Sequence, residues 1–224
     1  MNFHVVTIFP PAFDSYLKES IIGRAIKNKK IAIKFYNPRD FTKAKDWYKQ
    51  VDDRPYGGGP GMVLMALPIL KAISKAMRIS NFQFPISKQK RKIKIIIFSP
   101  AGKKFTNEYA KTLAKKYTDV VMISGRYEGI DARVKKILNA EDVSIGDYVL
   151  TGGELPAMVL NDSTARQISG VLHKSESLEE SRISSSEVYT RPEKLVYKGK
   201  SYKVPKVLLS GNHKDIEEWK KGRG

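Results

Sequence analysis

The chain has 224 residues, enough for one large domain or for a larger and a smaller one. Its 41 Lys and Arg residues outnumber its 23 Asp and Glu residues, and the resulting formal charge of +18 is typical of proteins that bind polyanions. The chain contains no cysteine, which excludes disulfides, thiolate zinc sites, cysteine-ligated iron–sulfur clusters and cysteine nucleophiles.

The N-terminal segment predicts a strand, a helix and a second strand. Residues 3–9 and 31–35 are short apolar runs, and the segment between them places an apolar residue at every fourth position. That helical stripe consists of Phe13, Leu17, Ile21 and Ala25. The first ten residues have neither the basic flank nor the small-residue cleavage site of a signal peptide. No apolar stretch approaches the ~20 residues of a membrane span, so we expect a soluble cytoplasmic protein without a membrane partner.

The middle of the chain continues to alternate between helices and strands. The run at residues 93–98 is almost uninterrupted isoleucine and predicts a central strand buried on both faces. Thr106 is suited to cap the helix that follows. Such alternation is typical of an α/β fold with a parallel sheet. The remaining expected elements are helices at 66–77, 106–116 and 132–138, and strands at 120–123 and near Val143.

Three glycine-containing loops follow the predicted strands. They are residues 99–102 (SPAG), 125–131 (GRYEGID) and 144–156 (SIGDYVLTGGELP). Glycines this dense let a backbone approach a ligand closely, and in parallel sheets ligands bind at the carboxyl ends of the strands. The three loops therefore predict one shared pocket at the strand ends, and together they look like a methyl-donor site.

Other common nucleotide and metal motifs are missing from the sequence. The chain lacks the Gly-x-Gly-x-x-Gly fingerprint and the P-loop, and the glycine run at 57–62 fits neither spacing, so it favours a turn. The three histidines show no metal-ligand spacing. Asp142 and Asp147 lie near expected turns, where acids usually serve as solvated caps. We therefore expect no metal site formed by protein side chains.

The pattern changes after Gln167. Residues 173–187 are rich in Ser and Glu, which predicts a mobile linker or an active-site loop. Residues 189–224 are basic, with a strand-like run at 204–209 and an expected closing helix at 215–221. A lysine-rich proteome would also raise the charge, but the clustering here favours polyanion binding. The clustered lysines are Lys194, Lys198, Lys200, Lys203 and Lys206.

With these motifs assembled, the sequence resembles the bacterial tRNA (guanine-37-N1)-methyltransferases of the SPOUT superfamily. Six motifs in the family's order carry the resemblance, which extends from residue 1 to about 219. They are the three loops above and residues 55–62 (PYGGGPGM), 189–193 (YTRPE) and 208–213 (LLSGNH).

The resemblance implies an α/β, parallel-sheet SPOUT fold with a deep trefoil knot and a small C-terminal domain. On that basis residues 1–161 form the methyl-donor domain, 162–188 a linker with catalytic residues, and 189–224 a shortened basic tRNA-binding domain. It also implies an obligate homodimer whose active sites are built from both chains. Physical rules alone would not predict the knot, because threaded connections are nearly absent from proteins.

The resemblance further implies S-adenosylmethionine as the methyl donor and tRNA with guanine at position 37 as the substrate, with no DNA partner. Magnesium, used by the family, would leave little protein signature. The implied donor-pocket residues are Ser99, Pro100, Gly102, Gly125, Tyr127, Ile145, Gly146, Tyr148, Leu150, Gly152, Gly153 and Pro156.

Three residues are candidates for catalysis. By resemblance, Arg166 would hold guanine O6, and Glu128 would lie near the donor or the target nucleotide. The family's general base is an aspartate followed by serine, but the matching stretch here reads SLEES at 177–181 and is one residue shorter. Glu180 is therefore our candidate for the base.

Two alternatives stay open on the sequence. The missing aspartate and the short C-terminal segment would also suit a knotted RNA-binding protein that has lost catalysis. A knotted methyltransferase could also act on a different RNA position, although the motif at 189–193 argues against it.

Overall fold

The computed structural model describes residues 1–42, 48–79, 92–172 and 187–221. Five parallel strands form its main sheet in the order β2-β1-β6-β5-β7. The α/β class with a parallel sheet is therefore confirmed, and β5 lies inside the sheet as expected. The strands are β1 (Asn2–Val6), β2 (Ala32–Tyr36), β5 (Ile93–Lys104), β6 (Asp119–Ile123) and β7 (Glu141–Ser144).

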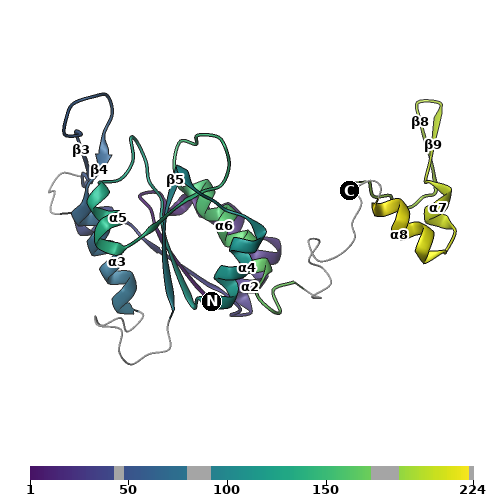
Figure 1. Ribbon diagram of the computed structural model, residues 1–224, viewed down its shortest axis with the longest axis horizontal. Helices are drawn as coiled ribbons and strands as arrows, with labels where there is room; N and C mark the ends of the chain where they lie inside the picture. Colours follow the sequence, from purple (N-terminus) through teal and green to yellow (C-terminus); the bar gives the residue numbers. More distant parts are fainter. Residues whose placement is uncertain (43–47, 80–91, 173–186, 222–224) are drawn as a thin grey trace. The chain divides into compact units, whose positions relative to one another are not determined.

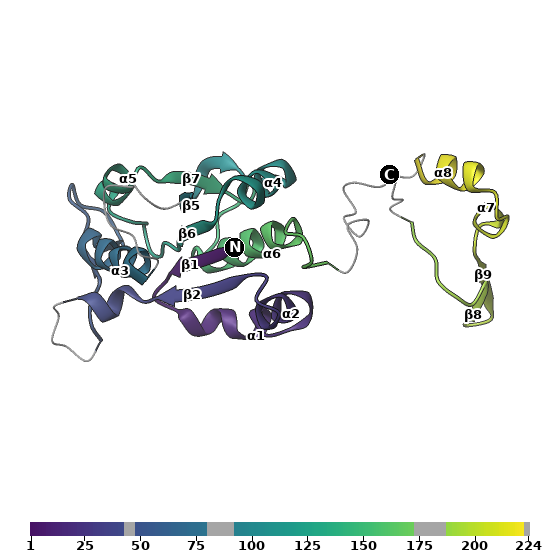
Figure 2. The same cartoon turned by 90° about the horizontal axis from the view of Figure 1, so that it is seen from below.

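Helices cover both faces of this sheet (Figures 1 and 2). One apolar core, including Phe3, Leu113 and Leu160, joins the sheet to α1, α2, α4 and α6. A second core, including Val6, Ile73 and Val134, joins the other face to α3 and α5. The helices are α1 (Asp14–Leu17), α2 (Ser20–Lys27), α3 (Ala66–Ile79), α4 (Asn107–Lys116), α5 (Ala132–Leu138) and α6 (Glu154–Arg166).

The expected N-terminal helix is divided. A 3-10 turn, η1 (Pro10–Phe13), leads into α1, and α2 begins at Ser20, whose φ of 49° interrupts the helical path. The interruption shifts the apolar stripe, so that Ile22 rather than Ile21 is buried. Further short elements are η2 (Pro38–Phe41) and the β3 (Asp52–Asp53) and β4 (Val63–Leu64) pair.

A bulge in β5 replaces the expected end of this strand at residue 98. Pairing with β7 shifts register between Phe98 and Lys103, and the strand continues to Lys104. At Gly102 a Cβ atom would lie 2.5 Å from the backbone of Asp142 and Val143. Gly102 therefore permits close contact between two strands, which is a packing role.

A buried polar pair joins the two central strands β1 and β6. Nε2 of His4 lies 3.1 Å from Oδ1 of Asp119, and both residues are less than 5% exposed. Burial alone would raise the pKa of Asp119, but hydrogen bonds with His4, Thr118 and Asn2 outweigh it and lower the pKa to about 2. The pair satisfies polar groups that would otherwise be costly inside the sheet.

The chain divides into two compact units, Met1–His173 and Lys174–Gly224. The boundary that we expected after residue 161 falls inside α6, because buried Thr164 and Ala165 keep the end of this helix in the first unit. The second unit contains β8 (Lys194–Tyr197), β9 (Lys200–Lys203), α7 (Lys206–Leu209) and α8 (His213–Lys221).

The strand expected at 204–209 is wrong. Pro205 caps α7 at this point, since its fixed φ suits the first turn of a helix, and the strands lie earlier in the chain. The closing helix is confirmed and begins two residues earlier than expected. Within the described residues, the helices are all too short or too polar to span a membrane.

Candidate active site

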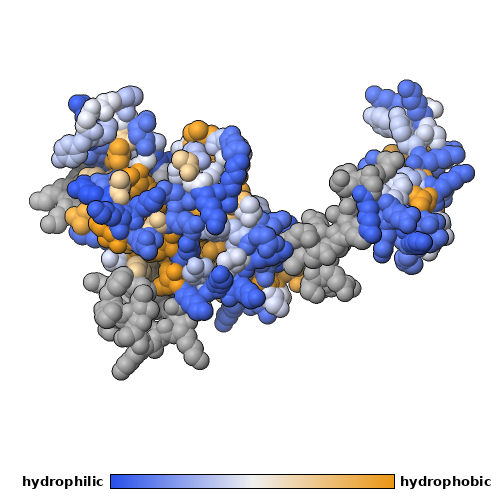
Figure 3. Space-filling view, viewed as in Figure 1, coloured by the Kyte–Doolittle hydropathy of each residue, from blue (hydrophilic) through white to orange (hydrophobic). Residues whose placement is uncertain are grey.

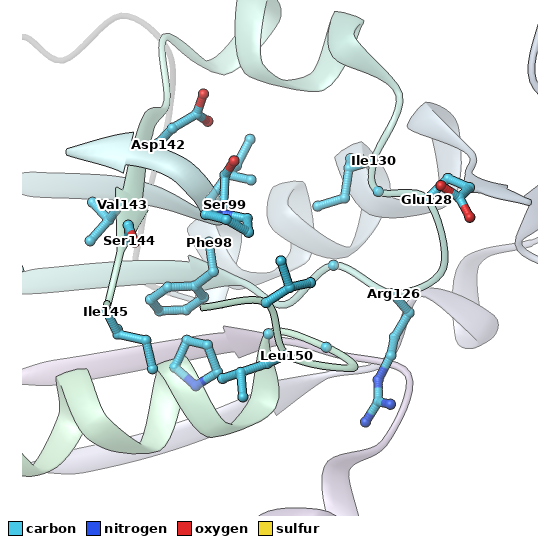
Figure 4. Close-up of a pocket in the computed structure, with 18 of the residues that line it drawn as sticks. Phe98, Ser99, Arg126, Glu128, Ile130, Asp142, Val143, Ser144, Ile145 and Leu150 are labelled. Carbon is cyan, nitrogen blue, oxygen red and sulfur yellow. The ribbon is translucent and has the colours of Figure 1, made fainter. Parts of the chain in front are cut away.

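A pocket of about 530 Å³ lies at one edge of the sheet, between the bulged part of β5 and the loops that follow β6 and β7 (Figure 4). Parallel strands bring their carboxyl ends to one edge of the sheet, as the sequence predicted. The pocket is lined by residues 97–100, 125–132, 135, 142–146, 148–153 and 156.

Eleven of the twelve residues expected around the donor form the wall of this pocket. The exception is Gly102, which lies in the β5 bulge and packs against β7. The eleven are Ser99, Pro100, Gly125, Tyr127, Ile145, Gly146, Tyr148, Leu150, Gly152, Gly153 and Pro156.

The pocket wall combines apolar side chains with closely packed backbone. Phe98, Ile145 and Leu150 line it (Figure 4). A Cβ atom on Gly146 would lie 2.3 Å from the ring of Tyr148, whose hydroxyl donates to the carbonyl of Ile145 at 3.3 Å. Only glycine lets the ring fold over the backbone here. Such a wall suits a ligand with flat apolar parts and a few polar groups.

Two of the loops are joined directly by their backbones. The amide of Gly153 donates to the carbonyl of Gly125 at 2.9 Å. A Cβ atom on Gly153 would lie 2.6 Å from the Cα of Ser124, so this contact requires glycine. The loop after β6 and the start of α6 therefore hold one side of the pocket as a single unit.

A partly buried ion pair supports the same side of the pocket. Nε of Arg126 lies 2.9 Å from Oε2 of Glu154, whose side chain is only 4% exposed. The hydroxyl of Thr7 donates to Oε1 of Glu154 at 2.7 Å, and the Arg126 guanidinium lies 4.7 Å from the centre of the Phe9 ring. Figure 4 shows the Arg126 side chain directed away from the pocket residues labelled above it.

Gly152 lies against this ion pair. A Cβ atom there would be 2.4 Å from Nε of Arg126 and 2.6 Å from Oε2 of Glu154. Neither Glu154 nor Thr7 was singled out from the sequence, since a buried carboxylate at a helix start has the same sequence pattern as a solvated one. The two adjacent glycines before Glu154 were the only feature of the sequence that indicated close packing around this carboxylate.

Tyr127 connects the pocket to the segment before β3. It adopts a φ of 58°, and its hydroxyl lies 3.3 Å from that of Tyr48. The hydrogen bond to Tyr48, with burial, raises the pKa of Tyr127 to about 12, so this phenol stays protonated near neutral pH. Arg39 stacks on Tyr48 with its guanidinium carbon 4.1 Å from the ring centre. Sequence reasoning missed Arg39 and Tyr48.

The three candidate catalytic residues have different placements. Glu128 is exposed on the pocket wall, and its amide donates to the carbonyl of Met62 at 3.0 Å. Arg166 ends α6, is partly buried and does not line the pocket. Glu180 lies outside the described residues.

The glycine run at 57–62 forms turns, as expected, with φ between 80° and 112° at Gly57, Gly58, Gly59 and Gly61. A Cβ atom on Gly61 would lie 2.6 Å from Glu128, so this run also packs beside the pocket wall. The described part of the chain contains no group of three or more His, Asp or Glu residues that could hold a metal ion.

Comparisons with known proteins agree on one family. The model of the family described as "tRNA (Guanine-1)-methyltransferase TrmD" matches residues 1–223. A tRNA (guanine-N(1)-)-methyltransferase of Pseudoalteromonas atlantica is 44% identical over 222 residues, covering 97% of this chain and 78% of the relative. One from Ruminiclostridium cellulolyticum is 46% identical over 227 residues, covering 98% and 89% respectively.

A solved structure is also similar. The crystal structure of tRNA (m1G37) methyltransferase from Aquifex aeolicus aligns with a TM-score of 0.76 at 37% identity. The alignment covers 99% of this chain and 88% of the Aquifex chain.

We expect the Arg126–Glu154 pair to contribute to stability as a unit. Glu154→Gln should lower the free energy of unfolding by about 2–3 kcal/mol, because it leaves a partly buried guanidinium without its counter-charge. Arg126→Met should have a similar effect, and the double variant should cost less than the sum. Denaturant unfolding of the three variants measures this coupling.

Asp147→Asn is the matched control, since the exposed Lys104–Asp147 pair is 2.6 Å long but both side chains are over 60% exposed. Its cost should stay below about 1 kcal/mol. Strictly additive costs for Glu154→Gln and Arg126→Met would contradict the coupling.

Proposed function

The chain belongs to the tRNA (guanine-N1)-methyltransferase family, and we propose that it transfers a methyl group from S-adenosylmethionine to N1 of guanine 37 in tRNA. The observation that carries this proposal is the family match over residues 1–223, which includes every loop of the pocket. As a member of this family, the protein is a methyltransferase that modifies tRNA.

The pocket suits the proposed donor. Its volume of about 530 Å³ lies within the ~300–1,000 Å³ of typical cofactor sites. Phe98, Ile145 and Leu150 offer apolar surface for an adenine ring, while the glycine-rich loops let backbone groups approach its polar edges. When bound, S-adenosylmethionine would supply a methyl group on a positively charged sulfur.

The reaction needs a proton acceptor and a cation near guanine. The N1–carbon bond forms as the sulfur–methyl bond breaks, while the N1 proton passes to a base and negative charge gathers on N1 and O6. We assign Glu180 as the base and Arg166 as the cation that donates to O6. Glu128, exposed on the pocket wall, would position the nucleotide or the donor.

A homodimer would complete the site. Arg166 does not line the pocket of its own chain. In the proposed mechanism, Arg166 of a second copy would reach this pocket. Exposed apolar residues beside the pocket offer a surface for a second copy: Phe9, Val149, Leu155 and Val159 are 43%, 81%, 55% and 45% exposed. Apolar surface is visible at the crest of the loop after β7 (Figure 3). Clusters of this kind commonly mark protein interfaces.

The proposal includes the family's deep trefoil knot around the donor. The backbone bond between Gly153 and Gly125 supports it, because the chain entering α6 passes directly against the loop after β6. Residues 162–188, which begin inside α6, would carry Arg166 and Glu180, and the basic domain at 189–224 would bind tRNA. Magnesium would act through phosphate and water ligands. We assign the reaction to the cytoplasm.

The reaction itself is tested with labelled S-adenosylmethionine and two tRNA transcripts that differ only in having guanine or adenine at position 37. We expect label in the guanine-37 transcript alone, released as 1-methylguanine on digestion. Equal labelling of both transcripts would indicate another RNA position. Tight tRNA binding without transfer would indicate a non-catalytic RNA-binding protein.

Donor binding should stabilise the protein, because a ligand that binds only the folded state shifts the unfolding equilibrium. S-adenosylmethionine at ~100 times its dissociation constant should add about 2.7 kcal/mol. Leu150→Ala should weaken donor binding about 10-fold through lost apolar contact. Thermal unfolding with and without donor measures both effects.

Leu67→Ala is the matched control, because Leu67 is also exposed but lies on α3, away from this pocket. Absence of any donor-dependent stabilisation in the unaltered protein would remove the pocket assignment. Equal donor affinities for the two variants would exclude Leu150 from the binding wall.

The general base is tested with two adjacent glutamates. Glu180→Gln preserves size but removes proton acceptance, so the single-turnover methylation rate should fall roughly 10²-fold or more, with tRNA affinity little changed. Glu179→Gln should have a mild effect. A large loss with Glu179→Gln and a mild effect with Glu180→Gln would show that Glu179, one residue earlier, is the base. Mild effects of both substitutions would show that the base is another residue.

A further inference from the structure

The second unit presents a basic two-stranded hairpin. In this hairpin β8 and β9 pair antiparallel, so that Lys194 faces Lys203, Leu195 faces Tyr202, Val196 faces Ser201 and Tyr197 faces Lys200. The ten residues from 194 to 203 include four lysines and no acidic residue. All ten are exposed, and Figure 3 shows this end of the unit as mainly hydrophilic.

The lysines of the hairpin are not neutralised by neighbouring carboxylates. Among the residues that the structure describes, none of the four forms an ion pair. Lys194 and Lys203 are directly opposed, and like charges in this relation destabilise a strand pair. An isolated two-stranded hairpin is only marginally stable in water, so its charge pattern works against its own folding.

The residues of the hairpin turn also differ from those that stabilise such a turn best. Lys198 and Gly199 form a two-residue turn with φ of 49° and 74°. A turn with two positive φ angles favours Asn-Gly or Asp-Gly, since a long side chain is disfavoured in the left-handed region. Lys198 places a cation at the tip, where its amine lies 5.5 Å from the centre of the Tyr197 ring.

One face of the hairpin carries aromatic side chains. Because cross-strand partners share a face, Leu195, Tyr197, Lys200 and Tyr202 lie together on one side. Leu195, Tyr197 and Tyr202 are 56%, 60% and 54% exposed. Exposed tyrosines beside lysines form the combination that binds single-stranded nucleic acids, by base stacking and phosphate contact.

We propose that the β8–β9 hairpin binds unpaired nucleotides of the substrate tRNA. Bases stack on Tyr197 and Tyr202, while Lys198 and Lys200 contact phosphates. This inference rests on the proposed function and identifies the contact surface that the basic domain uses. Charge complementarity favours RNA as the occupant, because the four exposed lysines of the hairpin attract a polyanion.

Lys198 at the tip of the hairpin provides a test, because its substitution should weaken RNA binding without lowering the stability of the protein. We expect Lys198→Asn in the full-length protein to keep or raise the melting temperature, since Asn-Gly suits this turn. At the same time, the salt dependence of tRNA affinity should become shallower by about 0.7 in log–log slope, the loss of one single-strand phosphate contact. Titrations at several salt concentrations measure the slope.

Lys115→Asn is the matched control, because Lys115 is an exposed lysine on α4 outside the hairpin. It removes the same charge and should leave the slope unchanged. Equal slopes for Lys198→Asn and the unaltered protein would overturn the phosphate contact at the tip. If the salt dependence of tRNA affinity changed equally in both variants, the cause would be the loss of overall charge. That result would also overturn the phosphate contact at the tip.

The stacking contacts are tested with ring and non-ring substitutions. Tyr197→Leu and Tyr202→Leu should each weaken tRNA binding about 5- to 150-fold, while Tyr202→Phe, which keeps the ring, should bind like the unaltered protein. Donor-dependent thermal stabilisation should be unchanged in all three. Unchanged affinity in both leucine variants would overturn the proposal. If the unaltered protein itself bound no tRNA, the proposed function would fail instead.

Discussion

The interaction between Arg126, Glu154 and Thr7 holds together three segments that are distant in the sequence. Thr7 follows β1, Arg126 belongs to the loop after β6, and Glu154 begins α6. Burying a carboxylate is costly unless its charge is compensated, and here one oxygen accepts a hydrogen bond from Thr7 while the other is paired in charge, without a hydrogen bond, with the guanidinium. This arrangement links one side of the pocket to the end of β1.

The pocket and the basic hairpin differ in their distribution of charge. The pocket wall combines glycine-rich backbone and apolar side chains with side chains of both charges, such as Glu128 and Lys135, so its charges are mixed. The hairpin carries unneutralised lysines, so a polyanion relieves the repulsion within it. The two surfaces belong to different compact units of the chain.

The sequence predicted the sheet better than the helices around it. Apolar runs such as residues 93–98 and 120–123 identify buried strands with little ambiguity. The helix α6 was not predicted, because buried Asn161 and Thr164 interrupt its apolar pattern, and two glycines and a proline lie near its start. The tertiary contacts of a helix, rather than its own periodicity, decide such cases.

The candidate site was predictable in outline. Loops at one edge of a parallel sheet converge, which predicted a shared pocket, and eleven of the twelve residues that the family resemblance implied line that pocket. The Arg126–Glu154 pair and the Tyr127–Tyr48 contact could not be predicted, because each joins residues from separate loops. Gly102 lies outside the pocket wall and packs against β7, and sequence alone does not distinguish a glycine that permits strand contact from one that permits ligand contact.

The sequence separation of the segments that form the pocket wall also affects when the pocket forms during folding. Its segments begin near residue 97 and end at residue 156, and the backbone bond from Gly153 to Gly125 closes it. Contacts between such distant segments form late, because loop closure must precede them. During synthesis the pocket is incomplete until the start of α6 has left the ribosome. Capture of a ligand there would therefore report that the start of α6 has packed against the loop after β6.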